Sequence, residues 1–354
     1  MRRKKLQWIS VFCSITLIIV FALMSVAYIV DPFFAYRVRD NTYMLPDSSV
    51  LPGIIKNHDY DALVIGTSMT QNFNMDSFRE KININPAKIS AGGMVLNDLK
   101  KLTVLANKVG KARSYYICLD LPRFTNDSKI ERVPDYLCDD NILNDYKYLL
   151  GYSPWMRFIP VDLALVTAKK IGINFNDEIE SKLEIDELGY WGDSFEFGRE
   201  IVISGYKNSS NTVSEINIED CYQDIIDNAD SLIESLEFGD YEYNFFFPPY
   251  SALYWCNAET QGYFDSFLKG KEYLVTKLKE KGCNVYDFQA ADFVSNLDYY
   301  KDITHYSPQI NEWMVDCFSE KLFLTDKNSV KMNNTKLKEI VKEFKIENSD
   351  IFKN

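Results

Sequence analysis

Three side chains that lie far apart in the sequence have the types and spacing of a nucleophilic triad. The first, Ser68, follows the apolar run 62–65 and Gly66, where a buried strand is expected to end and turn toward a helix. A serine hydroxyl becomes a good nucleophile when a base removes its proton, and histidine is the usual base near neutral pH. Open α/β sheets bind ligands at the carboxyl ends of their strands, which is the place expected for Ser68.

The base can be identified by elimination, because the chain contains two histidines, His58 and His305. His58 lies upstream of the first expected strand, and a strand advances about 3.3 Å per residue, so His58 should lie at the opposite edge of the sheet. His305 follows the last expected strand and therefore opens on the same edge as Ser68. Asp302, three residues before His305, can accept a hydrogen bond from Nδ1 and leave Nε2 facing the serine. The sequence predicts a triad of Ser68, His305 and Asp302.

The elements that must position this triad form an alternating pattern of apolar strands and amphipathic helices. This alternation predicts an α/β fold with a five-stranded parallel sheet. The expected strands lie at 62–65, 88–93, 114–120, 241–247 and 284–288, and a helix is expected at 308–324.

The alternation is interrupted at 125–240, which carries no buried-strand pattern and is expected to be a largely helical insertion. Helices are expected at 145–172 and 221–236, with turns or a small hairpin between 188 and 204. Long insertions at the ends of sheets commonly form lids or binding walls. A second lobe without contact to substrate is the alternative.

The N-terminus combines a basic cluster at 1–5 with an uncharged run of about 25 residues at 6–30, which is long enough to span a bilayer. The basic cluster places the N-terminus in the cytoplasm and the chain after Asp31 outside the cell membrane. Ser25-Val26-Ala27 resembles a signal-peptide cleavage site, so a cleaved signal peptide is the alternative. We expect a retained anchor, because the apolar run continues past that site.

The rest of the chain is expected to comprise a connector, a catalytic domain and a tail. The connector covers 31–60, the domain covers 61–324 with its insertion, and a peripheral tail with one amphipathic helix covers 325–354.

Composition excludes several classes of function. The net charge is −12 although four of the first five residues are basic, so the body is acidic, which argues against nucleic acid as a partner. The seven cysteines form no C-x-x-C pair, so no metal site is expected. Residues 66–68 do not continue into a G-x-G-x-x-G pattern, so no dinucleotide cofactor is expected either. The six cysteines beyond Cys13 allow disulfides, but their pairing does not follow from the sequence.

Three motifs together resemble the conserved blocks of the SGNH (GDSL-type) hydrolases. Gly66-Thr-Ser68-Met69 resembles the nucleophile block, Gly92-Gly93 resembles the second block, and Asp302-x-x-His305 resembles the last. The match covers roughly 60–124 and 241–318 and leaves out the insertion. The resemblance implies a flavodoxin-like three-layer sandwich in which Ser68, Asp302 and His305 are the triad.

The chain departs from that family in the third block. The family has an asparagine there that donates to the oxyanion, whereas this chain has Asp120 followed by Arg123. An ionised carboxylate cannot donate a hydrogen bond and would repel the developing charge. The expected oxyanion donors are therefore the backbone N–H groups of Ser68 and Gly93, in the Gly92-Gly93 turn, with Arg123. Asp120 capping a turn and Arg123 pairing with an acidic neighbour are the alternatives.

The anchor, this departure and Phe247-Pro-Pro-Tyr250-Ser251 resemble membrane-anchored SGNH-type proteins of cell-envelope modification. These include D-alanyl transfer proteins of teichoic acid and O-acetylation proteins of alginate-type polysaccharides. The resemblance implies acyl transfer, with acetyl as the expected group, to a cell-surface polysaccharide or related glycopolymer beside a membrane-bound O-acyltransferase. The proline pair is expected to turn Tyr250 and Ser251 toward the site, with a plain strand terminator as the alternative.

Two other functions remain open from the sequence. One is a polysaccharide or lipid esterase with the same triad. The other is a non-catalytic carbohydrate-binding or assembly protein that uses the aromatic residues around Tyr190 and Trp191 in the insertion.

Overall fold

The computed structural model describes residues 2–38, 47–125, 130–173, 186, 188–209 and 216–352. The chain divides into two compact units, one of 1–58 with 133–185 and one of 59–132 with 186–354. The expected insertion is therefore shared between the units, because its first part groups with the N-terminal segments and its second part with the sheet.

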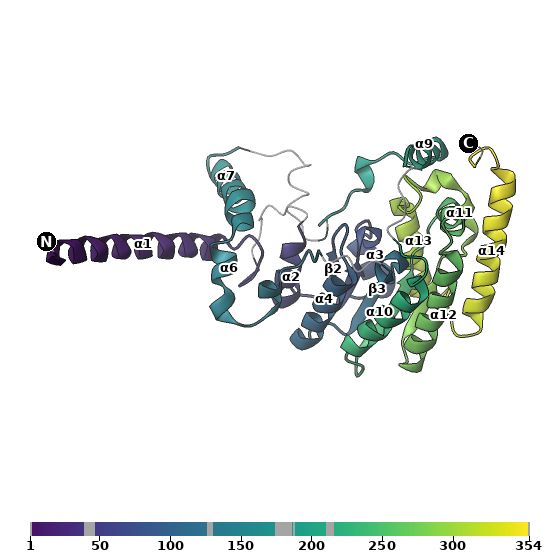
Figure 1. Ribbon diagram of the computed structural model, residues 1–354, viewed down its shortest axis with the longest axis horizontal. Helices are drawn as coiled ribbons and strands as arrows, with labels where there is room; N and C mark the ends of the chain where they lie inside the picture. Colours follow the sequence, from purple (N-terminus) through teal and green to yellow (C-terminus); the bar gives the residue numbers. More distant parts are fainter. Residues whose placement is uncertain are drawn as a thin grey trace. The chain divides into compact units, whose positions relative to one another are not determined.

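The second unit contains a five-stranded sheet, of which β2 and β3 are labelled in Figure 1. Every pairing is parallel, and the strand order is β2-β1-β3-β4-β5. The α/β class and the five parallel strands of the sequence prediction are thus confirmed. The strands are buried, and β1 is a continuous apolar run, as is typical of a parallel strand that is covered on both faces. The strands are β1 Ala62–Gly66, β2 Pro86–Ser90, β3 Ser114–Cys118, β4 Glu242–Phe247 and β5 Asn284–Asp287.

The register of the sheet brings the carboxyl ends of the strands to one edge. Gly66 at the end of β1 pairs with Ser90 at the end of β2. Likewise, the ends of β4 and β5 are joined by the pairing of Phe247 with Asp287. The loops that follow these strands, including those with the candidate site residues, therefore leave the sheet together.

The helices of the second unit include the helix expected in the insertion at 221–236 and the helix expected at 308–324. The small hairpin suggested for 188–204 is wrong, because a turn, a short 3₁₀ helix at Gly192–Ser194 and α9 occupy this stretch. The helices are α3 Met75–Ile82, α4 Leu96–Val109, α9 Arg199–Ser209, α10 Cys221–Ser235, α11 Ala252–Gln261, α12 Phe264–Glu280, α13 Pro308–Glu320 and α14 Ser329–Glu347.

The C-terminal helix α14 is an integral part of the second unit. It packs against α11 and α12 and buries Val330, Leu337, Val341 and Phe344. The expected amphipathic helix is therefore present, and its apolar stripe is covered by the domain rather than peripheral to it.

The first unit is helical in the residues described. It contains α1 Arg2–Val30, α2 Leu51–Asn57, α5 Asp135–Cys138, α6 Tyr146–Leu149, a π-helical turn at Pro154–Phe158 and α7 Ile159–Lys170. In α1, the 27-residue stretch Lys4–Val30 is long and apolar enough to cross a membrane, although a signal sequence would have the same character.

A buried ion pair joins α12 to the end of β5. Lys271 Nζ lies 2.9 Å from Asp287 Oδ2, and both side chains are fully buried. The carboxylate also accepts hydrogen bonds from Asn333 Nδ2 at 3.1 Å and from the N–H of Gln289 at 3.2 Å. Removing one member of such a pair leaves a buried charge without its counter-ion.

We therefore expect Lys271→Met to lower the free energy of unfolding by about 3–5 kcal/mol, measured by urea denaturation. Lys336→Met is the matched control, because it removes an ion pair with Asp292 whose members are 49% and 92% exposed. It should cost less than about 1 kcal/mol. Equal stability of the two variants would contradict this account of the pair.

Candidate active site

The three residues of the predicted triad meet in the structure. Ser68 Oγ lies 2.8 Å from His305 Nε2, although the two residues are 237 positions apart. On the other side of the ring, His305 Nδ1 lies 2.8 Å from Asp302 Oδ2 and 3.0 Å from Oδ1. Ser68 opens the 3₁₀ turn after β1, and Asp302 and His305 lie in the loop between β5 and α13. This is the order of contacts required for a base that activates a serine.

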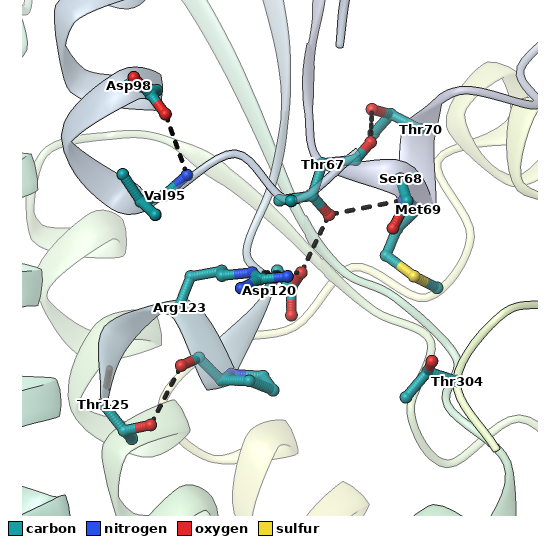
Figure 2. A network of polar contacts seen from close by, with 12 residues as sticks. Thr67, Ser68, Met69, Thr70, Val95, Asp98, Asp120, Arg123, Thr125 and Thr304 are labelled. Carbon is teal, nitrogen blue, oxygen red and sulfur yellow. Dashed lines mark hydrogen bonds and ion pairs between the residues drawn. The ribbon is translucent and has the colours of Figure 1, made fainter. Parts of the chain in front are cut away.

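The turn that carries Ser68 depends on a glycine. A Cβ added at Gly66 would lie 2.5 Å from Thr70 Cγ2 and 2.8 Å from Cys118 Cβ, so a larger residue would force the turn away from β3. Thr70 Oγ1 donates to the carbonyl of Thr67 at 2.9 Å and closes the turn from inside (Figure 2). Ser68 is the first residue of the turn, so its N–H has no intrahelical acceptor.

The loop that carries His305 is organised around the carboxylate of Asp302. Asp302 Oδ1 accepts hydrogen bonds from the N–H of His305 at 2.8 Å and from the N–H of Thr304 at 2.9 Å. Burial alone would raise the pKa of Asp302, but the hydrogen bond and charge of His305 and the two backbone donors lower it overall. The carboxylate is therefore ionised and orients the imidazole.

Ser251 and Tyr306 tie this loop to its neighbours. Ser251 Oγ donates to the carbonyl of Ile303 at 2.7 Å, and Tyr306 Oη donates to the carbonyl of Met69 at 3.0 Å. Ser251, which was expected to face the site, is fully buried and also caps the N-terminus of α11. Ser251 therefore stabilises the loop that carries His305 and is not placed to contact a substrate.

Asp120 is a buried acceptor that joins the ends of three strands. It is 5% exposed, and its carboxylate accepts a hydrogen bond from Thr67 Oγ1 at 2.9 Å (Figure 2). It accepts another from Tyr250 Oη. Burial, and then the charge of Asp120, raise the pKa of Tyr250 well above its ordinary value, so the phenol remains a donor. Tyr250 was expected to face the site, but it is 1% exposed. It supports the turn that carries Ser68 through Asp120, which also binds Thr67.

Of the two alternatives, the pairing of Arg123 with an acidic neighbour is present, whereas the Asp120 side chain does not cap a turn. Arg123 Nε lies 3.6 Å from Asp120 Oδ2, so the guanidinium pairs with an acidic neighbour. Asp120 occupies the N-cap position of the 3₁₀ turn Leu121–Phe124, but its side chain makes no capping hydrogen bond there. Its two oxygens serve the links to Thr67 and Tyr250 instead.

Gly92-Gly93, the second predicted block, lies beside the turn that carries Ser68. A Cβ built on Gly92 would lie 3.7 Å from Gln71 Oε1, directly after the turn. Gly93 has φ of +71°, and a Cβ there would lie 2.9 Å from Arg132 Nη2. Arg132 Nε donates to the carbonyl of Gly93 at 3.0 Å and so fixes the orientation of this peptide. Neither Gln71 nor Arg132 carries a sequence signal that would have identified it.

An aromatic wall borders His305 and comes from the part of the insertion that belongs to the second unit. The ring of Trp191 lies perpendicular to the imidazole, with centroids 5.6 Å apart. Lys301 Nζ lies 4.4 Å from the centroid of Trp191 and 3.7 Å from that of Phe195. Burial lowers the pKa of Lys301, although the charge of Asp302 opposes this. Trp191 was singled out from the sequence, whereas Phe195 and Lys301 were not.

The comparisons with known proteins find no matching family model and no matching curated protein. Within the described residues no group of three or more metal-binding side chains comes together, and none of the seven cysteines there forms a disulfide. The site therefore has to be interpreted from its own geometry.

Tyr250→Phe should lower the free energy of unfolding by about 1–3 kcal/mol, because the buried Asp120 carboxylate loses a donor. Tyr115→Phe is the matched control: this tyrosine is equally buried, and its hydroxyl has no hydrogen-bond partner in the described structure. Urea denaturation should leave the control unchanged or slightly stabilised. A Tyr250→Phe protein as stable as the control would show that Asp120 does not need this donor.

If the predicted triad is catalytic, Asp302→Asn lowers kcat for hydrolysis of p-nitrophenyl acetate by about 10⁴-fold, because an amide holds the imidazole in the wrong tautomer. Steady-state kinetics measure the effect, and Asp292→Asn, at a carboxylate that is 92% exposed, should have no effect. Wild-type rates in Asp302→Asn would contradict its assigned role.

The same carboxylate affects how stability depends on pH. Because its pKa is lowered, Asp302 stays ionised as the pH falls to the ordinary carboxyl value of 3.8. The stability that it contributes is present above that value and is lost only at lower pH.

Proposed function

We propose that the chain is a serine acyl enzyme of the SGNH type. The observation that carries the proposal is the continuous hydrogen-bonded series from Ser68 Oγ through both ring nitrogens of His305 to Asp302. Ser68 is half-exposed, so an acyl group can reach it from solvent. The parallel strand order β2-β1-β3-β4-β5 supports a flavodoxin-like three-layer sandwich, since that fold has the same order.

The proposed reaction has two steps. Ser68 Oγ attacks the acyl carbonyl carbon while His305 Nε2 takes its proton, and the resulting imidazolium gives the proton to the leaving alcohol. The acyl group is then an ester on Ser68. In the second step a sugar hydroxyl attacks this ester and passes its proton to His305, which returns it to Ser68.

The oxyanion of each tetrahedral intermediate needs hydrogen-bond donors. We assign this role to the N–H groups of Ser68 and Gly93, with the guanidinium of Arg123 adding positive charge. Asp120 is excluded as a donor, because its carboxylate accepts from Thr67 and Tyr250.

The acceptor that we propose is a cell-surface polysaccharide or related glycopolymer. Trp191 presents aromatic surface beside His305, and Phe195, which is 50% exposed, packs against Trp191 with ring centroids 5.5 Å apart. Aromatic rings of this kind suit the apolar faces of sugars. Acetyl is the acyl group that we expect.

We further propose that α1 is a retained anchor that places the catalytic unit outside the cell membrane. Ala27, which ends the signal-peptidase-like sequence, is fully buried, and Val30 is 5% exposed, so the end of α1 is built into the first unit. A tether of this kind suits transfer from a membrane-bound donor, and a membrane-bound O-acyltransferase is the partner that we propose.

The test is turnover of p-nitrophenyl acetate by the purified protein, with and without an oligosaccharide acceptor. Ser68→Ala should lower the rate by about 10⁴-fold or more, whereas Ser295→Ala, at an exposed serine, should not change it. Acetylated oligosaccharide among the products supports the transferase, and release of acetate alone supports an esterase. An unchanged rate in Ser68→Ala would overturn the serine mechanism.

A further inference from the structure

Helix α7 exposes several apolar side chains and buries its one acidic residue, which is unusual for a helix in water. Its one acidic residue, Asp162, is 3% exposed, whereas Leu163 is 48% exposed and Val161 is 37% exposed. Soluble helices normally bury their apolar residues and expose their charges. The pattern of α7 is that of a helix whose outer surface meets an apolar medium.

The exposed side of α7 forms one continuous face with Met156, in the π-helical turn before it, and with Ile171, directly after it. Residues three and four positions apart lie on the same side of a helix, and the members of this face are Met156, Pro160, Leu163, Ala164, Thr167 and Ile171, all exposed. Its one polar member, Thr167, donates its hydroxyl to the carbonyl of Leu163 at 2.6 Å and so offers no free donor. We refer to these six residues as the α7 face.

Within the described residues, α1 is the one helix that is long and apolar enough to cross a membrane, so α7 is not a second crossing. The 12 residues of α7 extend over about 18 Å, whereas the hydrocarbon core is about 30 Å thick, and Arg157 in the π-helical turn before α7 carries a charge. An apolar segment of this length that is not covered by protein fits the interfacial layer of a bilayer, with its axis in the membrane plane.

The start of α7 is fixed to the end of α1. Phe158, the residue before α7, packs edge-on against Phe33, with ring centroids 4.8 Å apart. Phe33 lies two residues after Asp31. The buried carboxylate of Asp31 accepts hydrogen bonds from the N–H of Ala35 at 2.9 Å and from Tyr148 Oη at 2.9 Å. Figure 1 shows α7 beside the C-terminal end of α1 and lying across the direction of that helix.

Two aromatic residues of α1 mark where the bilayer surfaces would lie. Trp8 and Tyr28 are 75% and 47% exposed, and at 1.5 Å per residue they are about 30 Å apart along the helix. Tryptophan and tyrosine concentrate at the two interfaces of a membrane, and this separation equals the thickness of its hydrocarbon core. Tyr28 also contacts Tyr36 and Arg37, so the outer interface of the membrane would lie where α1 meets the rest of the first unit.

We propose that α7 lies in the outer interfacial layer of the membrane that α1 crosses, with the α7 face inserted among the acyl chains. The ligand is the lipid bilayer itself, and the site is a second attachment of the first unit to it. Lys169 and Lys170 at the end of α7 are exposed and would reach the phosphates of anionic headgroups. This inference needs α1 to be a membrane helix but does not depend on the acyl chemistry.

The test measures the depth of nitroxide labels in the full chain, purified alone and reconstituted in vesicles of phosphatidylcholine and phosphatidylglycerol. Cys13 and Cys138, the cysteines that are not buried, are first replaced by alanine. One label is then placed by Leu163→Cys on the α7 face. Val104→Cys on α4 is the matched control, since Val104 is an apolar helix residue that is 45% exposed.

The ratio of collisions with oxygen to collisions with a water-soluble nickel complex should be several-fold higher at position 163 than at position 104. Ala164→Cys, on the same face, should give the same ratio as Leu163→Cys. This second label shows whether the ratio at 163 reflects the position of the face or a local effect of the Leu163→Cys substitution. Equal ratios at 163 and 104 would overturn the proposal. Protection of position 163 from both reagents, or spin–spin broadening, would also overturn it and would indicate that protein covers the α7 face.

Discussion

The hydrogen bond between Ser68 and His305 is the interaction on which the account of this chain depends. It joins segments 237 residues apart across 2.8 Å, and it can form only if the ends of β1 and β5 open on the same edge of the sheet. Parallel pairing provides this, because the register aligns the carboxyl ends of adjacent strands. The topology of the sheet is therefore a condition for the chemistry.

A second constraint is the burial of a carboxylate beside the nucleophile. Asp120 is nearly inaccessible to water, and a charge in that position must have hydrogen-bond donors. Thr67 and Tyr250 provide them, and in doing so they connect the ends of β1 and β4 to the end of β3. Asp120 is thus a structural link, and in the mechanism that we propose the hydrogen bonds to the oxyanion come from backbone N–H groups, with Arg123 adding positive charge.

Much of this arrangement follows from local patterns in the sequence. The apolar runs predict the five strands, because a buried parallel strand needs apolar residues on both faces. With two histidines in the chain, elimination leads to His305 and then to Asp302. Other features depend on tertiary contacts that no local pattern encodes. The bond from Arg132 to Gly93 and the division of the insertion between two units are of this kind. The exposure of α7 is another, because apolar composition alone does not tell a core helix from one at a surface.

The most direct test of the central claim is covalent labelling of the nucleophile. The full chain is treated with a fluorophosphonate, and the modified residue is identified by peptide mass spectrometry. The account predicts one adduct, on Ser68, that is lost when His305 is replaced by alanine, since the serine then has no base. An unlabelled Ser68, or equal labelling of Ser68 without His305, would contradict it.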